Sequence, residues 1–443
     1  MQPEERSRVR AVPNAYVGSP SGGPHTSGRQ VRIAPSRRVR IAVAVALAGA
    51  ALLAVARVDR PRALDAGRVV LGGAQGSVRG VDAERTAAAL DPPGTVRRHG
   101  AHLYLDATMF RFLGINVPQA ATDPVVSPGC GAEVDLAGLF ARLPSRTVVR
   151  VGFGQDTTIS ASTGERDWAA LDRVVALAAA SPSQPKLIVS LTSQGGTCDS
   201  GRWKDRAWYA GGYLWPSVGT DGRARAAYVD FLDAVVGRYA ASPTIAYWEP
   251  VGEPEPADCG GGATGSDCYG HKTCPPDATD VLRRFFDDVG ARVRRLDLVH
   301  PIADGAIGGG QCGWGGNGNR AILASPGLDV ATFHDYGRDA EAMPTELRDR
   351  IGDATALGKP IVVDEVGIDA RDVARCTSRA ARSTMLAAKL GASMAAGVTG
   401  FVPWDYAERL DDRCDTRITP DDPSFALVVG SAPSAAAVMT AAP

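Results

Sequence analysis

Short apolar runs alternate with longer stretches that carry apolar residues at three-to-four spacing over most of the chain. Runs of this length predict buried strands, and they lie at 110–116, 147–152, 186–192, 244–248, 301–306, 330–336, 360–365 and 400–404. The stretches between them predict amphipathic helices, at 167–180, 223–239, 277–296, 341–357 and 378–396, with weaker patterns near 133–142 and 433–442. Strands that alternate with helices imply parallel pairing through helical crossovers. Eight repeats therefore predict an α/β fold, a closed (β/α)8 barrel.

Two short alternating runs around a glycine turn precede the first of these strands, at 95–106. This pattern predicts a hairpin, which we expect to close the barrel floor. Barrels of this class commonly reach roughly 250 residues or more as one unit. We therefore expect residues 94–443 to form a single domain.

The residues before this domain fall into three segments. Residues 1–40 are rich in Pro, Gly, Ser and Arg, which predicts a disordered tail. Residues 41–56 form an uninterrupted apolar run behind a basic cluster; as a helix it would measure about 24 Å against a hydrocarbon core of roughly 30 Å. That length favours a signal peptide cut after Ala56, with an uncleaved signal-anchor as the alternative. Residues 57–93 are expected to be a linker.

Composition narrows the choice of partners. The chain has 48 Lys and Arg against 49 Asp and Glu, a formal net charge of −1, so nothing favours a nucleic-acid surface. A neutral substrate fits this balance better. We expect a secreted or extracellular monomer that contacts a membrane only through residues 41–56, and only if that segment is not cleaved.

Cysteines follow the predicted strands. All eight fall after a strand and before its helix, and so on one rim of the barrel: Cys130, Cys198, Cys259, Cys268, Cys274, Cys312, Cys376 and Cys414. An exported chain favours disulfides, here up to four, although sequence does not choose the pairs. Cys268, His271 and Cys274 could also suggest a zinc site, but no second ligand pair stands at the required spacing. We expect a rim braced by disulfides.

Two predicted strands each have a glutamate at or near their end, on this same rim. Glu253 closely follows the strand at 244–248, and Glu365 ends the strand at 360–365. Catalytic residues of α/β barrels lie at the carboxyl ends of strands. Two carboxyl groups about 5 to 5.5 Å apart cleave a glycosidic bond with retention, and this chemistry requires no metal and no organic cofactor. Because side chains alternate along a strand, we expect Asp364 to point the other way from Glu365, towards the helices.

Over roughly residues 95–430, the chain resembles the retaining glycosidases of glycoside hydrolase family 5 and its barrel clan. The motifs that carry the resemblance are Trp248-Glu249-x-x-x-Glu253-Pro254, His334-x-Tyr336, Lys359-Pro360 before Glu365-x-Gly367, Arg150 ending the second strand and Trp404 ending the eighth. The run 328–336 looks most like the β-mannanase branch. The resemblance implies a carbohydrate substrate, a β-linked polysaccharide or oligosaccharide of mannan or glucan type.

By this resemblance Glu253 would be the general acid/base and Glu365 the nucleophile of a double displacement. Tyr336 would hydrogen-bond the nucleophile, His334 would contact sugar, and the charge of Arg150 would keep Glu365 ionised. Trp404 would stack on a pyranose ring, and Trp314, with Trp203, Trp208 and Trp215, could form further sugar subsites or simply pack the rim loops. We interpret Glu249 as structural.

The chain departs from the family pattern in two places. Gly252 stands where an asparagine normally grips the sugar 2-hydroxyl, and Thr192-Ser193-Gln194 stands where a histidine often ends the third strand. Gln194 could replace part of the missing hydrogen bonding. Two alternatives therefore stay open: a barrel that binds carbohydrate with impaired catalysis, and a transglycosylase that uses the same glutamates.

Overall fold

The structure is a computed structural model that describes residues 92–123, 130–131, 133–160, 162–259, 268, 271–337, 343–410 and 413–430. All of these residues lie in one compact unit of the chain. Four predicted segments lie outside the described residues. They are the disordered tail at 1–40, the apolar leader at 41–56, almost all of the linker at 57–93 and the helix at 433–442. None of the helices in the described ranges is long and apolar enough to cross a membrane.

Seven parallel strands form one sheet in the order β12-β13-β14-β4-β5-β6-β9. Their bounds are β4 (Phe112–Val117), β5 (Val148–Gly152), β6 (Lys186–Ser190), β9 (Ile245–Glu249), β12 (Ala331–Asp335), β13 (Ile361–Val366) and β14 (Gly400–Pro403). The eighth predicted strand joins the two ends of this sheet. Within it, Ile302 bridges to Trp248 and Ala303 bridges to Val330, both in parallel. The predicted closure into a (β/α)8 barrel is thereby confirmed.

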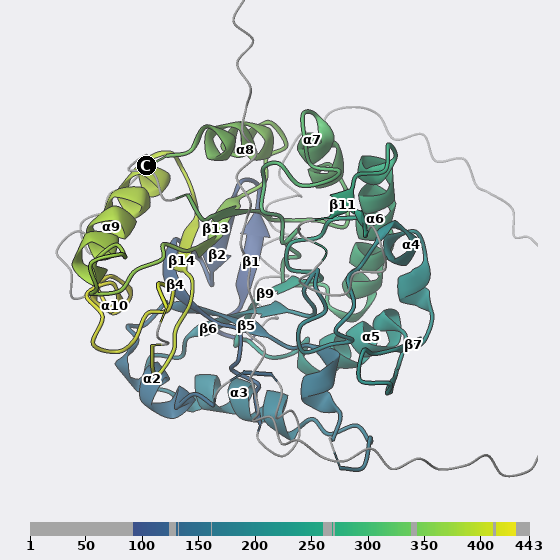
Figure 1. The fold of residues 1–443 in the computed structure, drawn as a ribbon, viewed down its shortest axis with the longest axis horizontal. Helices are drawn as coiled ribbons and strands as arrows, with labels where there is room; N and C mark the ends of the chain where they lie inside the picture. The colour runs from purple at the N-terminus through teal and green to yellow at the C-terminus, as the bar shows by residue number, and fades with distance from the viewer. Residues whose placement is uncertain are drawn as a thin grey trace, which may run out of the picture. The chain divides into compact units, whose positions relative to one another are not determined.

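Helices surround these strands (Figure 1). Six of them correspond to predicted helices: α2 (Leu136–Arg142), α3 (Ala169–Ala180), α5 (Tyr228–Tyr239), α6 (Ala278–Leu296), α8 (Thr345–Ala356) and α9 (Arg379–Ala395). The sequence did not predict the short elements of the loops, because one or two turns carry too little periodicity. These are α4 (Arg206–Tyr209), α7 (Gly318–Leu323), α10 (Phe425–Val428), η1 (Gln155–Thr158), η2 (Gly212–Leu214) and the strand pairs β7 (Ser217–Val218) with β8 (Ala224–Arg225) and β10 (Asp258–Cys259) with β11 (Lys272–Thr273).

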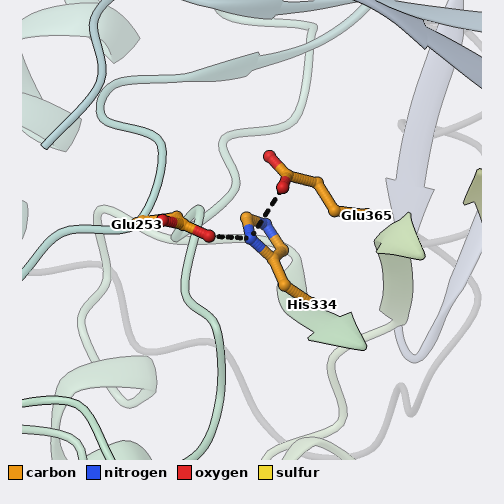
Figure 2. Close-up of side chains that lie close together, drawn as sticks. All are labelled: Glu253, His334 and Glu365. Atoms are coloured by element: carbon orange, nitrogen blue, oxygen red, sulfur yellow. Dashed lines mark hydrogen bonds and ion pairs between the residues drawn. The ribbon is translucent and has the colours of Figure 1, made fainter. Parts of the chain in front are cut away.

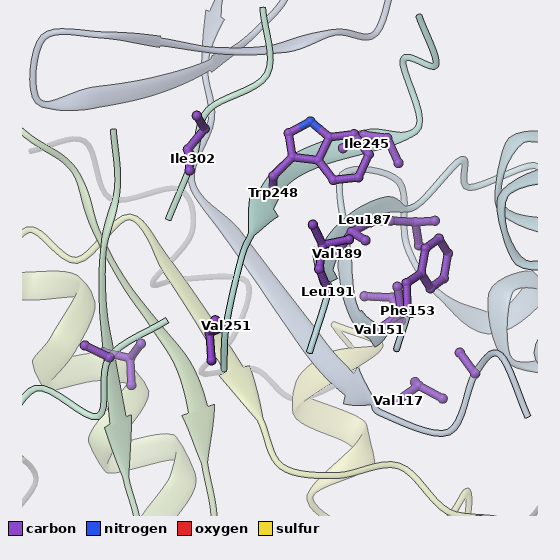
Figure 3. Close-up of a cluster of buried hydrophobic side chains, with 14 of the residues drawn as sticks. Val117, Val151, Phe153, Leu187, Val189, Leu191, Ile245, Trp248, Val251 and Ile302 are labelled. Carbon is purple, nitrogen blue, oxygen red and sulfur yellow. The ribbon is translucent and has the colours of Figure 1, made fainter. Parts of the chain in front are cut away.

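Apolar side chains form an outer core between the strands and the helices. Along β6 and just beyond it, Leu187, Val189 and Leu191 occupy alternate positions and belong to this outer cluster (Figure 3). Trp248 of β9 lies in the same layer, beside Ile302 of the eighth strand. The period of two leaves the intervening side chains of each strand for the barrel interior.

The interior is closed from below by the predicted hairpin, β1 (Val96–His99) and β2 (His102–Leu105), to which β3 (Thr108–Met109) adds a third strand. Val96 and Leu103 of the hairpin are fully buried in one cluster with Val148, Val362 and Val402 from the barrel strands. The hairpin thus fills the floor of the barrel, as expected. The candidate functional residues lie at the opposite end.

Candidate active site

Backbone hydrogen bonds fix the segment that carries Glu253. Gly252 N donates to Thr192 O at 2.8 Å, and Glu253 N donates to Gly305 O at 2.7 Å. Glu253 has a φ of 61°, a left-handed conformation that is uncommon for a residue other than glycine. Its side chain is 16% exposed. These contacts hold the carboxyl group of Glu253 in place at the barrel mouth, where it is largely buried and not freely solvated.

The strand that carries Glu365 contains an irregularity. Phe333 of β12 pairs with Val363, but the next residue, His334, pairs with Glu365, so the register skips Asp364; a second shift interrupts the pairing of β13 with β14. Bulges of this kind re-aim side chains next to active sites. Here the bulge brings Glu365 into the barrel mouth, although alternation alone would send it elsewhere.

The expectation for Asp364 is wrong for the same reason. Ile361 and Val363 lie in the outer core, whereas Val362 faces the interior. Asp364 continues the interior series, and the bulge adds Glu365 to the same side. Two successive acids thus lie within the barrel.

His334 lies between the two glutamates (Figure 2). Its Nδ1 atom is 2.9 Å from Glu253 Oε1 and 3.3 Å from Glu365 Oε2. One nitrogen or oxygen atom of each of the three residues lies within 4.8 Å of those of the other two, so the two carboxyl groups belong to one cluster. The buried imidazole contacts both glutamates and is not an isolated core histidine.

Arg150 supports the site from β5. Its Nη1 donates to Glu365 Oε1 at 2.5 Å and to Asn116 Oδ1 at 3.0 Å. Its Nε and Nη2 donate to the two oxygens of Glu249 at 3.0 and 2.6 Å. Glu249 is fully buried in this pair, which supports its interpretation as a structural acid.

Tyr336 and Trp404 complete the surroundings of Glu365. Tyr336 Oη donates to Glu365 Oε2 at 2.5 Å, which is the contact expected from the sequence. Trp404 follows β14, is half-buried, and is tied to the end of β13 because its backbone N donates to Val366 O at 2.8 Å. Its position at the mouth leaves a role in stacking on sugar as a prediction.

Burial and charge shift the pKa values of these groups. Burial raises the pKa of Glu365, and the nearby charge of Glu253 adds to the rise, while His334 and Arg150 oppose it. Arg150 therefore limits this rise instead of holding the pKa of Glu365 below its usual range. Burial also works against charge on Glu249 and His334, but Arg150 lowers the pKa of Glu249, and the surrounding carboxylates, Glu365 first, raise that of His334 well above its usual value.

The atoms of Glu253, His334 and Glu365 are also close enough to ligate a metal ion, and no other such group occurs in the described part of the chain. A histidine that ligates a metal ion must be neutral, because the bond uses the lone pair of a ring nitrogen. The raised pKa of His334 favours the protonated ring. We therefore interpret the cluster as an acid–base site.

Two predicted substrate-binding residues have structural roles instead. Gln194 is buried, and both ends of its amide are used: it donates to Lys204 O and Glu255 O, and accepts from Tyr209 Oη and Glu255 N. Trp314 is 0% exposed, and its Nε1 donates to Pro254 O at 2.7 Å. Neither side chain is available to a sugar, because each is buried and hydrogen-bonded to the residues that directly follow Glu253.

The other rim tryptophans mostly pack loops as well. Trp203 is buried and donates to Ala257 O, and Trp208 packs among aromatic rings that include Phe285. Trp215 differs, since it is 70% exposed. Gly252 is closely surrounded: a Cβ there would lie 3.2 Å from both Arg150 Nη2 and Glu249 Oε1.

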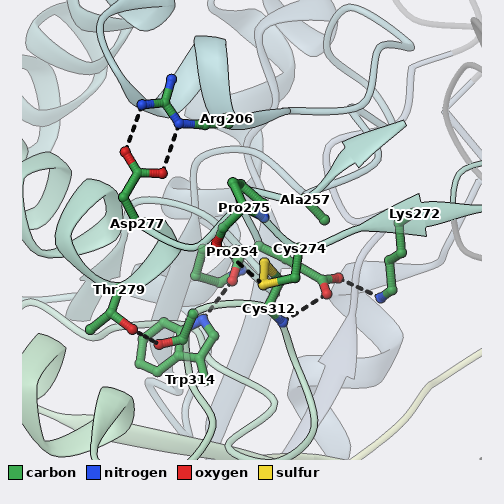
Figure 4. The surroundings of a disulfide bond; sticks show 12 residues. Arg206, Pro254, Ala257, Lys272, Cys274, Pro275, Asp277, Thr279, Cys312 and Trp314 are labelled. Carbon is green, nitrogen blue, oxygen red and sulfur yellow. Dashed lines mark hydrogen bonds and ion pairs between the residues drawn. A yellow bond between two sulfur atoms is a disulfide. The ribbon is translucent and has the colours of Figure 1, made fainter. Parts of the chain in front are cut away.

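Three disulfides brace the rim, as predicted: Cys259–Cys268, Cys274–Cys312 and Cys376–Cys414. The second joins the loop after β9 to the loop after the eighth strand, behind Pro254 and Trp314 (Figure 4). These pairings also exclude a zinc site built on Cys268 and Cys274. Cys130 and Cys198 are not bonded but carry free thiols, and the Cys198 thiol is hydrogen-bonded to that of Cys130.

Sequence reasoning missed two supporting residues. Asn116 orients Arg150 and also donates to Asp364 O at 2.8 Å. Asp364 itself lies 3.3 Å from His334 and 3.9 Å from Arg150. Asn116 could have been found from the sequence, because it is a polar residue near the end of an apolar strand. The position of Asp364 could not, because the bulge that places it leaves no clear pattern in the sequence.

The sequence of the chain is similar to those of named mannosidases over part of its length. No family model matches the chain. Its sequence is 28% identical to mannan endo-1,4-beta-mannosidase A of Podospora anserina over 162 residues, 34% of this chain and 39% of that protein. It is 25% identical to probable mannan endo-1,4-beta-mannosidase F of Aspergillus flavus over 277 residues, 58% of this chain and 51% of that protein. The chain thus spans about two fifths to one half of the length of these curated relatives.

Solved structures show the same fold. The endo-1,4-beta-mannanase from Rhizomucor miehei superposes with a TM-score of 0.55 at 19% identity, covering 78% of this chain and all of that one. A glycoside hydrolase family 5 mannosidase from the same organism gives a TM-score of 0.52 at 13% identity, covering 78% and 98%. The chain therefore shares the fold of these mannanase and family 5 mannosidase structures.

Proposed function

We propose that this family 5-like chain is a retaining glycoside hydrolase that cleaves β-linked mannan by a two-glutamate double displacement. The proposal rests above all on the placement of Glu253 and Glu365, whose nearest oxygens lie within 4.8 Å of each other beside His334. That spacing suits retention, because an inverting site needs roughly 6.5 to 9.5 Å between its carboxyl groups. The names of the curated relatives favour mannan over glucan.

In the first step, Glu253 gives its proton to the glycosidic oxygen while an oxygen of Glu365 attacks the anomeric carbon. The bond to the leaving sugar breaks, and a glycosyl ester forms on Glu365. Arg150 Nη1 and Tyr336 Oη each contact one oxygen of Glu365 and so fix the orientation of the attacking carboxylate. Fixed donors of this kind need no reorganisation during the reaction.

In the second step, Glu253 acts as a base. It takes a proton from water, whose oxygen attacks the anomeric carbon and releases Glu365 as a carboxylate. Because His334 Nδ1 faces both glutamates, a protonated ring stabilises whichever of them is negatively charged at each stage. Trp404 is proposed to stack on the sugar ring at the mouth.

The protein is also proposed to be exported and monomeric. Three disulfides support an oxidising compartment. The apolar run at 41–56 supports a signal segment. The mass of the mature secreted chain tests both cleavage after Ala56 and the alternative of an anchor.

A hydrolysis screen over mannans, glucans, xylans and arabinans tests the activity, with the anomer of the first product followed by NMR. We expect turnover on mannan with retention, and a loss of several orders of magnitude in kcat for Glu365→Ala. Glu346→Ala, an exposed acid on α8, is the matched control and should match the wild type. Gly252, which stands where the family usually has an asparagine, supports one alternative, a barrel that binds sugar without cleaving it. Full sugar affinity with no turnover in the wild type would favour that alternative, and products of transfer instead of hydrolysis would indicate a transglycosylase.

A further inference from the structure

Asp364 is a buried carboxyl group directly beneath the catalytic glutamates. It is 0% exposed, and its Oδ1 lies 3.3 Å from His334 Nε2, without the alignment of a full hydrogen bond. Its Oδ2 lies 3.9 Å from Arg150 Nε. Neither oxygen has a hydrogen-bond partner among the described residues. A buried carboxyl group without hydrogen bonds is costly, so its position calls for an explanation.

Charged and titratable groups act on Asp364 from three other strands of the barrel. His334 faces it from β12, Arg150 from β5, and Glu249 and Tyr247 act on it from β9. Glu365 is its neighbour on β13. In this setting burial raises the pKa of Asp364 to about 7, so the group changes charge near neutral pH.

The imidazole of His334 is held between acids on its two sides. Nδ1 faces Glu253 and Glu365, while Nε2 faces Asp364. A ring protonated at both nitrogens can donate in both directions, whereas a neutral ring must present a lone pair to one side. The group at Nε2 therefore influences what Nδ1 offers to the two glutamates.

We propose that Asp364 is a positioning residue, which fixes the orientation and the positive charge of His334 and thereby sets the proton that Glu253 and Glu365 share. This inference rests on the proposed hydrolase function. Asp364 acts only through the imidazole, because it lies below the ring and is closed off from the mouth. The skipped register at Asp364 is the device that places two successive acids on the two sides of one histidine.

Asp364→Asn tests the proposal, because an amide keeps the size but removes the charge. We expect kcat on mannan to fall about tenfold or more while KM changes less than about threefold. The alkaline limb of the pH profile of kcat/KM should move to lower pH by roughly one unit, because His334 loses a counter-charge and deprotonates more easily. Asp349→Asn, the same exchange at an exposed position on α8, should leave the profile unchanged. An unmoved alkaline limb in Asp364→Asn, or a rise in KM with kcat retained, would overturn the proposal.

A second measurement does not depend on activity or on the folding of a variant. In the wild-type protein labelled with 15N-histidine, the ring of His334, assigned by its loss in His334→Gln, should carry protons on both nitrogens at pH 7. A neutral ring at this pH contradicts the proposal even if the enzyme is active. Conversely, a protonated ring in a protein that hydrolyses no glycan would sink the hydrolase function and leave the assignment of His334 intact.

Discussion

Arg150 and Glu249 form a buried bidentate ion pair, in which Nε and Nη2 of the arginine reach the two oxygens of the glutamate at 3.0 and 2.6 Å. The same guanidinium also reaches Glu365. Replacing it with methionine leaves two buried carboxyl groups without their cation. We expect Arg150→Met to cost about 3–5 kcal/mol of unfolding free energy and to abolish most activity.

Urea denaturation followed by circular dichroism measures this cost. Arg238→Met is the control, because Arg238 makes an equally short pair with Asp172 on the exposed surface. That variant should lose no more than about 1 kcal/mol. Equal losses in the two variants would show that burial of the Arg150 pair has no special weight.

Gly252 lies against this ion pair, so adding a methyl group there should disturb it. The Cβ of an alanine would lie 3.2 Å from both Arg150 Nη2 and Glu249 Oε1, and neither atom can move without lengthening the pair. We expect Gly252→Ala to lower kcat about tenfold. Gly237→Ala, in helix α5 with no atom near the new methyl group, should instead stabilise the protein by roughly 0.5–1 kcal/mol. Steady-state kinetics and thermal melts on both variants check the prediction, and full activity in Gly252→Ala would refute it.

Two tryptophans should respond in opposite ways to truncation. Trp404 is half-buried at the mouth, so Trp404→Ala should raise KM for mannan about tenfold and leave the fold stable. Trp314 is fully enclosed, so Trp314→Ala should cost roughly 3–5 kcal/mol of stability through the cavity it creates. Kinetics and urea denaturation distinguish the two effects. A KM that does not move in Trp404→Ala removes this residue from the proposed sugar contacts.

Thiol titration tests the state of the cysteines. The denatured, unreduced protein should show two thiols, from Cys130 and Cys198, and eight after reduction. No thiols before reduction would mean that this pair is also oxidised, giving the four disulfides that the sequence analysis allowed as a maximum. More than two would contradict the three disulfides.

The Cys274–Cys312 bridge closes a separation of 38 residues, and removing it should loosen the loop behind Glu253. In the chain-entropy description a loop of this length contributes roughly 4 kcal/mol. We expect Cys274→Ser/Cys312→Ser to lower the melting temperature clearly and kcat moderately. Cys130→Ser/Cys198→Ser is the matched control and should change both much less.

Asp297 should give the protein part of its acid sensitivity. Its carboxylate lies 2.7 Å from both His300 Nδ1 and Trp248 Nε1; burial opposes its charge, but these contacts lower its pKa to about 2. Because the folded pKa lies below the unfolded value, the carboxylate stabilises the fold above about pH 4, and this contribution is lost as the pH falls towards 2. It amounts to about 2 kcal/mol at neutral pH.

Urea denaturation of Asp297→Asn between pH 7 and pH 2 checks this prediction. The deficit of the variant relative to the wild type should be largest near pH 7 and shrink towards pH 2. The exposed Asp349→Asn should show little deficit at any pH. A deficit that is independent of pH would mean that Asp297 acts by shape and not by charge.

The sequence predicted most of the barrel because the outer core imposes its period on the strands. Side chains alternate as predicted along β6 and just beyond it, where Leu187, Val189 and Leu191 all face the helices. It failed at Asp364, because a bulge depends on how two strands pair and not on either strand alone. Register is a tertiary property, which local pattern does not record.

The residues of the site were likewise predicted in part, and for a similar physical reason. Glu253, Glu365, His334 and Tyr336 were predicted from motifs at strand ends, and the structure brings them together. Gln194 and Trp314 were misjudged, because residue type alone does not reveal whether a polar or aromatic side chain is already satisfied by its own loops. Hydrogen bonding to distant backbone atoms decided both cases.

The hairpin at the barrel floor leaves the barrel interior accessible from one end only. Its first strand begins at Val96, packed among interior side chains at the end of the barrel away from Glu253 and Glu365. Because the hairpin plugs this end of the barrel, a molecule can reach the two glutamates only by way of the carboxyl ends of the strands.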